Sequence, residues 1–261
     1  MAIIPSAGRR LPDERQRRGL QSPHLRLAAF RLVGKGPVAI RSDLWHAPPC
    51  LTKQTTHTIL VTRRRSLMKP TLILASASPR RKQLLKEAGY EFEIEPAGID
   101  EPEPNSEMSP WAYAAHLAWH KAAEVARRRS TGLILGADTI CVVDGEILNK
   151  PLDRADAERM IRLQEGRNTH VISGICLYSV DRHEWIGAVE VSVVKFRPLG
   201  DEERLAYLDS ERWQGKSGGY GVQDKDPFVS VASGSFSNVV GLPLERLEAL
   251  LRTYPMLSTG A

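Results

Sequence analysis

Apolar and polar positions in the second part of the chain predict alternating strands and helices. An apolar run at 72–74 leads into a small, hydroxyl-rich turn at 75–78, and a helix follows. Ser78 suits the N-cap of that helix, Pro79 its first position and Gly89 the residue just beyond its end. The pattern therefore predicts a strand, a turn and a helix at the start of the folded region.

Further elements follow as far as residue 251, with helical and strand periods in turn. The predicted helices cover 109–129, 155–164, 201–208 and 244–251. The predicted strands cover 133–143, 146–148, 170–180, 185–196, 228–231 and 235–239. Asp144-Gly145 is typical of a tight hairpin turn. Strands mixed with helices, including a hairpin, predict an α/β fold with a mixed sheet.

Charge divides the chain into two parts. Residues 1–67 hold 13 basic and 3 acidic residues, whereas residues 68–261 hold 23 basic and 28 acidic ones. The formal net charge of +5 therefore comes from the first part, and the remainder is mildly acidic. The basic balance is no argument for nucleic-acid binding by residues 68–261, and we expect none there.

Residues 1–67 show no sustained helical or strand period, and three interpretations remain open. The segment is Arg-rich and acid-poor, as organelle transit peptides are. It is also typical of a basic tail that binds an acidic partner. The third interpretation, which we favour, is that translation starts at Met68, directly before the first convincing strand. In each case we expect the segment to be poorly ordered and dispensable for the chemistry of 68–261.

Cysteine usage and hydropathy narrow the class of protein. The three cysteines lie far apart and without a Cys-x-x-Cys spacing, which argues against a disulfide framework or a zinc site and favours a cytoplasmic location. No apolar run approaches ~18 residues, so we expect no membrane span.

The predicted strand–turn–helix has the features of a phosphate site. Backbone N–H groups at a helix start attract anions. Arg80 and Arg81 add forked donors that match phosphate oxygens. Capping serines and paired surface arginines are common without any ligand, so this motif alone leaves phosphate binding open.

Other candidate residues are spread along the rest of the chain. Asp138 lies in an apolar strand, where a charge is costly unless it is paired or binds a metal, so it is a candidate base or metal ligand. Asp100 and Glu101 form a second acidic cluster. Lys121 and Lys150 would supply charges for phosphates, and Gln223 could read a base or position water. Each of these residues also has an ordinary structural or surface explanation.

Two further patterns carry less weight. His116 and His120 have the i, i+4 spacing of a metal pair, but no Glu follows the first and no third ligand is evident. The chain has neither a P-loop nor a Gly-x-Ser-x-Gly elbow, so it is not expected to be a P-loop enzyme or a common serine hydrolase.

Taken in order, the motifs resemble the Maf family of nucleoside triphosphate pyrophosphatases over about residues 70–251. The motifs are LASASPRR at 74–81, GIDE at 98–101, Leu117 to Ala122, GADT at 136–139, Leu148 to Pro151, GYGVQ at 219–223 and VGLPL at 240–244. The resemblance implies an elongated α/β sheet with flanking helices and a cleft between two lobes, related to inosine-triphosphate pyrophosphatases. It also implies a homodimer and a Maf-like domain over residues 68–261.

The resemblance implies hydrolysis of a nucleoside triphosphate to the monophosphate and pyrophosphate, with Mg²⁺ or Mn²⁺. By resemblance, Asp138 accepts the proton from water, and Glu101 and Asp138 hold the metal. The implied substrate-binding residues are Ser76, Arg80, Arg81, Lys121, Thr139, Lys150 and Gln223.

Arg80, Thr139 and Gln223 resemble the branch of the family that is selective for dTTP and UTP, with modified pyrimidine nucleotides as further candidates. Asn149, Ser217 and Asp224 depart from the usual residues and leave room for a broader or different preference. Two other classes stay open: a non-catalytic nucleotide-binding regulator of cell division, and nucleic-acid binding through residues 1–67.

Overall fold

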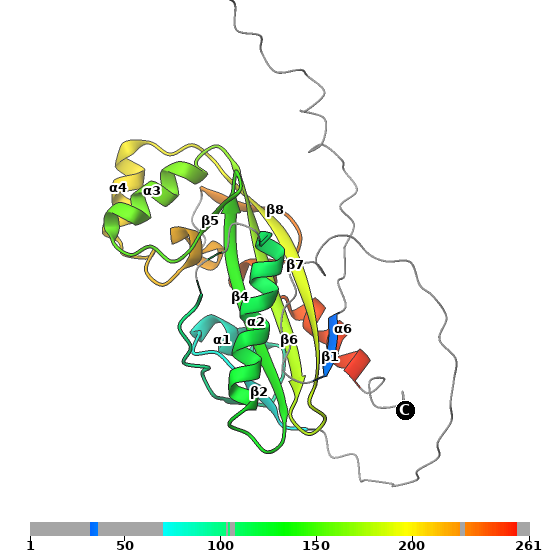
Figure 1. Cartoon of the computed structure of the whole chain (residues 1–261). Coiled ribbons are helices and arrows are strands. Elements are labelled where there is room, and N and C mark those ends of the chain that lie inside the picture. The colour runs from blue at the N-terminus through cyan, green and yellow to red at the C-terminus, as the bar shows by residue number, and fades with distance from the viewer. Residues whose placement is uncertain (1–31, 36–69, 103, 105–107, 225–227, 255–261) are drawn as a thin grey trace, which may run out of the picture.

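The fold is a mixed sheet with helices on its faces (Figure 1). The computed structural model describes residues 70–102, 104, 108–224 and 228–254, and the backbone of 32–35. The strands are β1 (Leu32–Lys35), β2 (Leu72–Leu74), β3 (Phe92–Ile94), β4 (Leu133–Val143), β5 (Glu146–Leu148), β6 (Asn168–Ser179), β7 (Glu184–Phe196) and β8 (Val229–Ser233). The helices are α1 (Pro79–Glu87), α2 (Pro110–Ala126), α3 (Arg154–Gln164), α4 (Asp201–Asp209), α5 (Phe236–Val240) and α6 (Leu244–Thr253).

The described strands form one sheet in the order β1-β7-β6-β4-β2-β3, with β5 on β4 and β8 on β7. The pairs β2–β3 and β2–β4 are parallel, and the remaining pairs are antiparallel. The predicted mixed α/β sheet is confirmed.

Strand β4 has one continuous edge and one interrupted edge. Along one edge, Leu133–Val142 pairs with β6 without a break. Along the other, β2 pairs with residues 133–135 and β5 with residues 141–143. Among the described strands, none therefore neighbours residues 136–140 on that side, and this gap separates two lobes.

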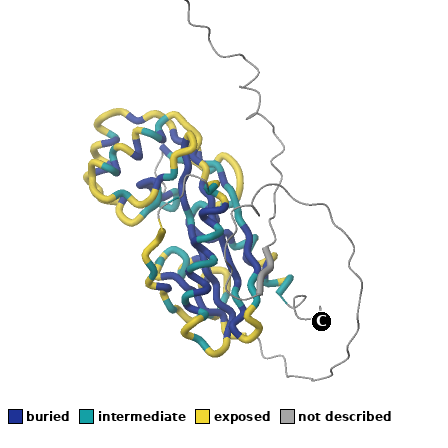
Figure 2. The backbone as a smooth tube through the Cα atoms, in the orientation of Figure 1, coloured by how far each residue is buried: buried dark blue, intermediate teal, exposed yellow. Residues whose placement is uncertain are grey.

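Each lobe has its own hydrophobic core, and β4 contributes to both. The first cluster packs Leu133 and Leu135 against α1 and α6, and the second packs Cys141 and Val143 against α3 and α4. Figure 2 shows the buried backbone as a continuous band along the long strands, with exposed segments at the two ends. Asp138 and Thr139 lie between the two clusters, where the lobes meet.

Helix α2 packs unusually close to the sheet because glycines face it. A Cβ atom added at Gly136 would clash with the carbonyl oxygen of Ala118, and one at Gly174 with that of Ala114. Both collisions are with helix backbone, which a rotamer change cannot relieve. The glycines thus determine how near α2 comes to β4.

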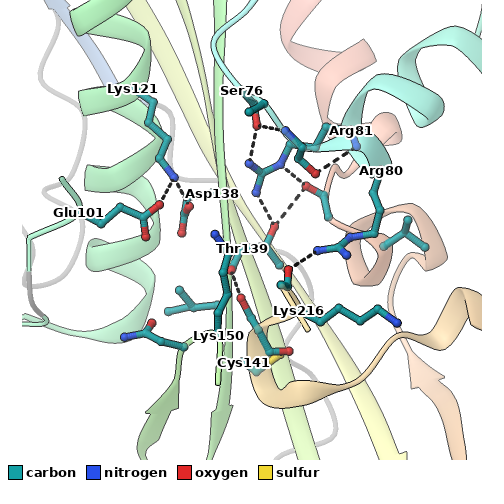
Figure 3. A pocket seen from close by; sticks show the side chains of 18 of the residues that line it. Ser76, Arg80, Arg81, Glu101, Lys121, Asp138, Thr139, Cys141, Lys150 and Lys216 are labelled. Carbon is teal, nitrogen blue, oxygen red and sulfur yellow. Dashed lines mark hydrogen bonds and ion pairs between the residues drawn. The ribbon is translucent and has the colours of Figure 1, made fainter. Parts of the chain in front are cut away.

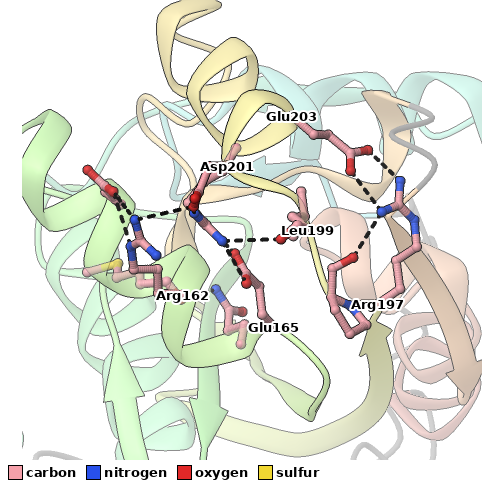
Figure 4. Close-up of polar contacts among 11 residues, drawn as sticks. Arg162, Glu165, Arg197, Leu199, Asp201 and Glu203 are labelled. Carbon is pink, nitrogen blue, oxygen red and sulfur yellow. Dashed lines mark hydrogen bonds and ion pairs between the residues drawn. The ribbon is translucent and has the colours of Figure 1, made fainter.

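The α3–α4 lobe is fastened by an ion-pair network (Figure 4). Arg204 binds Glu165 through two N–H groups, at 2.6 and 3.0 Å, and contacts Asp201 at 2.5 Å. It also donates to the carbonyl of Leu199. The side chains of Arg204 and Glu165 are 5% and 16% exposed, whereas that of Asp201 is 83% exposed, so the network reaches from the interior of the lobe to its surface.

The structure corrects the sequence prediction in three places. Residues 235–239 were expected to form a strand, but Phe236–Val240 is a short helix, capped by Ser235 and ended by Gly241 at φ 129°. Five apolar and polar residues are too few to separate the two periods. Strand β3 was not predicted, although residues 90–95 (YEFEIE) alternate apolar and acidic side chains in the way that is typical of a strand.

The third correction concerns residues 1–67, where no strand was expected. The backbone of Leu32–Lys35 forms β1, antiparallel to Glu184–Gly187 of β7. The other residues of this segment, including Met68, lie outside the described residues, and so does the expectation that the segment is poorly ordered. None of the described helices combines the length and hydrophobicity that crossing a bilayer requires.

Candidate active site

A cavity of about 690 Å³ lies beside the unpaired stretch of β4. It takes lining residues from both lobes, and all of the candidate residues named by the family resemblance line it. These are Ser76, Arg80, Arg81, Glu101, Lys121, Asp138, Thr139, Lys150 and Gln223.

One side of the cavity, the carboxylate wall, consists of Glu101, Lys121 and Asp138 (Figure 3). Lys121 reaches from α2 between the two acids, with Nζ at 2.7 Å from Glu101 Oε1 and 2.5 Å from Asp138 Oδ1. Asp138 is 6% exposed and Lys121 is 9% exposed. The side chain of Glu101 is 42% exposed. Two acids around one ammonium leave this triad with a net negative charge, which favours a further cation.

The environment of Glu101 keeps this carboxylate ionised. Partial burial works against the charged form, but the hydrogen bond from Lys121 and the charges of Lys121, Lys150 and Arg81 outweigh it and lower the pKa of Glu101. The loop that carries Glu101 is held in turn by Tyr113, whose hydroxyl donates to the carbonyl of Pro102 at 2.8 Å.

The opposite side, the arginine wall, consists of Ser76, Arg80, Arg81 and Thr139. Arg81 donates from Nε to the carbonyl of Gly241 at 2.9 Å, from Nη1 to Ser76 Oγ at 3.1 Å and from Nη2 to Thr139 Oγ1 at 3.4 Å. A guanidinium has five N–H donors, so two remain for a ligand. Burial lowers the pKa of Arg81, although Asp138 partly offsets this, and the side chain stays charged.

The hydroxyl of Thr139 is held from several sides. It lies 2.7 Å from Ser173 Oγ and 3.2 Å from the carbonyl of Gly241. Because β4 alternates its side chains, Asp138 faces Lys121 while Thr139 faces Arg81. Consecutive residues of one strand thus serve the two walls.

The start of α1 differs from the expected anion site. Ser78 caps the helix by accepting from the Arg81 amide, Pro79 has no N–H, and the Ser78 amide donates to Ser76 Oγ. Fewer backbone donors are free than the sequence indicates, because the cap consumes them. The Arg81 side chain is therefore the stronger phosphate donor at this end.

The remaining predicted residues come from the second lobe or reach toward it. Arg80 Nη2 donates across the cavity to the carbonyl of Gly215 at 3.2 Å. Lys150 forms no hydrogen bond within the described part of the chain and is exposed at the cavity. Residues 215–221 (GKSGGYG) form a glycine-rich loop. Gln223 follows this loop and is half-buried.

Neither the His116–His120 pair nor Cys141 contributes a reactive group to this site. The rings of His116 and His120 stack with centroids 5.9 Å apart, and the described residues contain no cluster of three His, Cys, Asp or Glu side chains suited to a metal. Cys141 lines the cavity, but burial raises the pKa of its thiol to about 12, so it is not a thiolate nucleophile.

Sequence reasoning missed the supporting residues of this site. Tyr113 looked like one member of an apolar stripe, and Ser173 like an ordinary strand residue. Lys216 was read only as part of a glycine-rich loop, yet it lines the cavity and pairs with Asp224. The only sequence feature that pointed to this ion pair was Asp224, which departs from the residue usual at that position.

Comparisons with known proteins identify the family and several relatives of this chain. The family described as Maf-like protein matches residues 71–254. A dTTP/UTP pyrophosphatase from Rhodopirellula baltica is 45% identical over 190 residues, covering 70% of this chain and 82% of its own length. Proteins of the same name from Ruminiclostridium cellulolyticum and Symbiobacterium thermophilum are 44% and 41% identical, covering 69% and 73% of this chain and 94% and 98% of their own.

A solved nucleoside-triphosphatase (dITP/XTP pyrophosphatase) from Mycobacterium abscessus aligns with 72% of this chain and 96% of its own, at 15% identity and a TM-score of 0.35. That likeness is too distant to add to the assignment. The family match spans most of the chain and all the cavity motifs, and it confirms the resemblance seen in the sequence. The chain belongs to the Maf-like protein family.

Proposed function

We propose that this chain hydrolyses dTTP and UTP to the nucleoside monophosphate and pyrophosphate. The single observation that carries the proposal is the cavity at the β4 gap, where a carboxylate–lysine triad faces a fixed arginine. The names of the relatives supply the nucleotides, because those proteins are dTTP/UTP pyrophosphatases.

In this proposal Asp138 is the general base. Its Oδ1 accepts a hydrogen bond from Lys121, and Oδ2 takes the proton of the attacking water. Lys121 holds Asp138 in place and compensates the charges of both acids. General-base catalysis by a positioned side chain contributes roughly 10²–10⁴-fold in rate.

The arginine wall would bind the substrate. Arg81 has two N–H donors left after its three internal bonds, and its fork matches two phosphate oxygens. Lys150 would add a point charge from the second lobe. Ser76 fixes Arg81, while Arg80, Thr139 and Gln223 would contact the nucleoside and select the base.

Glu101 and Asp138 would hold a divalent cation, Mg²⁺ or Mn²⁺. Carboxylate oxygens are the ligands these cations prefer, and Mg²⁺ is commonly held by one or two carboxylates together with substrate phosphates. The donor set therefore fits, although it supplies two acids and not three. When bound, the metal would neutralise charge on the phosphates.

The substrate range is tested with the full-length protein, Mg²⁺ or Mn²⁺, and a panel of nucleoside triphosphates including modified pyrimidines. We expect pyrophosphate release that is fastest with dTTP and UTP and that chelation by EDTA abolishes. Faster turnover of purine nucleotides would replace the specificity we propose by a broader one. Nucleotide binding without turnover would instead favour a regulator.

We also propose that the protein acts in the cytoplasm as a homodimer. Sedimentation equilibrium of the full-length chain measures the oligomeric state, and a monomer at micromolar concentration would contradict the dimer.

A further inference from the structure

An ion pair joins the two ends of the glycine-rich loop at the cavity. Lys216 Nζ is bonded to the carboxylate of Asp224, and the two side chains are only 12% and 21% exposed. Lys216 lines the cavity together with Arg80 and Gln223. The pair is therefore placed at the nucleoside side of the proposed site, away from the carboxylate wall.

The middle of this loop is already fixed to the α3–α4 lobe. Gln164 Nε2 donates to the carbonyl of Gly218 at 2.7 Å, and the Tyr207 hydroxyl donates to that of Gly219 at 3.0 Å. Gly218 and Gly219 have φ values of 71° and 73°, which glycine adopts without strain. What these bonds do not fix is the last part of the loop, which carries Gln223.

The side chains of Lys216, Gln223 and Asp224 converge on the backbone of Gly221. A Cβ atom built at Gly221 would lie 2.5 Å from Gln223 Nε2 and 2.9 Å from both Lys216 Nζ and Asp224 Oδ2. The carboxamide of Gln223 is thus packed beside the ion pair. Since Asp224 is the next residue along, the pair also restrains the backbone of Gln223.

We propose that Asp224 and Lys216 are positioning residues: their ion pair sets the Gln223 carboxamide against the nucleobase and neutralises Lys216. This inference rests on the proposed function. The second effect matters because phosphate is attracted by any unpaired ammonium in a cavity. Arg81, Lys121 and Lys150 mark the phosphate end of the cavity. An unpaired Lys216 would create a second, competing place for the phosphates to bind.

The experiment compares Asp224→Asn, Lys216→Met and the charge-swapped double variant Lys216→Asp/Asp224→Lys in the full-length chain. With Asp224→Asn we expect the KM for dTTP to rise about tenfold, a change of about 1.4 kcal/mol, with kcat altered less than threefold. The kcat/KM preference for dTTP over GTP should fall by a similar factor.

Inorganic tripolyphosphate separates the two effects, because it has no base. It should bind about tenfold more tightly to Asp224→Asn than to the wild type, since this variant leaves Lys216 unpaired. Lys216→Met removes the same pair but leaves the Asp224 carboxylate unpaired instead of an ammonium, so it should lose base preference but gain no tripolyphosphate affinity. The swapped variant should recover part of the preference.

Glu203→Gln is the matched control, because it breaks an exposed ion pair with Arg197 in the same lobe and outside the cavity. Thermal unfolding checks that each variant is folded, and Lys216→Met carries the test should Asp224→Asn not fold. Unchanged KM and base preference in both single variants would overturn the inference.

The proposed function fails in a distinguishable way. If the wild type releases no pyrophosphate, dTMP and tripolyphosphate binding by calorimetry still report on the pair. Weaker dTMP binding in both single variants then supports the inference, and equal binding overturns it.

Discussion

The carboxylate wall and the arginine wall each take one residue from strand β4, Asp138 and Thr139, yet their key side chains are held in different ways. Asp138 is fixed by one charged partner, Lys121, whose approach depends on the packing of α2. Arg81 is fixed by three neutral oxygens: the Gly241 carbonyl and the hydroxyls of Ser76 and Thr139. A charged partner tunes ionisation as well as position, whereas neutral acceptors set position alone. This difference supports our proposal that one wall transfers the proton and the other binds the substrate.

The largest expected effect is on the carboxylate wall. Asp138→Asn keeps the shape of the side chain but removes the base, so kcat for dTTP should fall by roughly 10³-fold. The KM should change less than kcat, because the phosphate contacts proposed for Arg81, Lys121 and Lys150 stay in place. Pyrophosphate release under saturating dTTP measures this, and a variant with the wild-type rate would exclude Asp138 as the base.

A second change reaches the same wall without touching a charged residue. Gly136→Ala puts a methyl group against the Ala118 carbonyl, so α2 must move and Lys121 must shift from Asp138. We expect a loss of kcat of about 10²-fold, since misplacement by 1 Å costs that order. The control is Gly200→Ala, where no atom lies within 4 Å of the added Cβ and φ is −73°; equal losses in both variants would refute the packing argument.

On the arginine wall, Arg81→Lys retains charge but loses the fork. An ammonium cannot reproduce the three bonds to Ser76, Thr139 and Gly241, so we expect kcat/KM to fall by roughly 10–100-fold, mainly through KM. Steady-state kinetics with dTTP separates the two constants. A pure kcat effect would move Arg81 from recognition to catalysis.

A substitution outside both walls tests whether stability and activity separate. Arg204→Met leaves Glu165, whose side chain is 16% exposed, without its two-pronged partner in the α3–α4 lobe, and losing hydrogen bonds to a charged group costs about 1.5–3 kcal/mol. Urea unfolding should detect this loss, with the KM for dTTP unchanged at low temperature. Unchanged unfolding would mean that the network is dispensable.

The smallest effect concerns pH. The pKa of Glu101 is lowered by Lys121, Lys150 and Arg81, so its contribution to stability is present above the unfolded-state value, near 4.5, and fades as the pH falls through the lowered value. Because Glu101 is partly exposed, we expect this contribution to be small. Unfolding of Glu101→Gln and the wild type from pH 7 to 3 should converge at the acidic end.

The elements were predictable wherever their patterns were long. The eleven-residue strand β4 and the helix α2 were found close to their observed bounds, because caps and periodicity agree there. The short helix α5 was not, since five residues carry too little pattern to separate helix from strand. Strand β3 was missed although residues 90–95 alternate apolar and acidic side chains. Asp138 was singled out as a charge in an apolar strand, whereas Ser76 and Thr139 were named only through the order of the motifs.

The sequence by itself determined the family motifs, the helix caps and the charge contrast between residues 1–67 and 68–261. Only the tertiary structure decided that β4 lacks a neighbour among the described strands at 136–140, and that Lys121 lies between two acids while Arg81 is tied to three oxygens. Apart from the bond between Arg81 and Ser76, which spans 5 positions, those contacts join residues 17 to 160 positions apart. Local propensity cannot encode them, because they depend on how two lobes close around one strand.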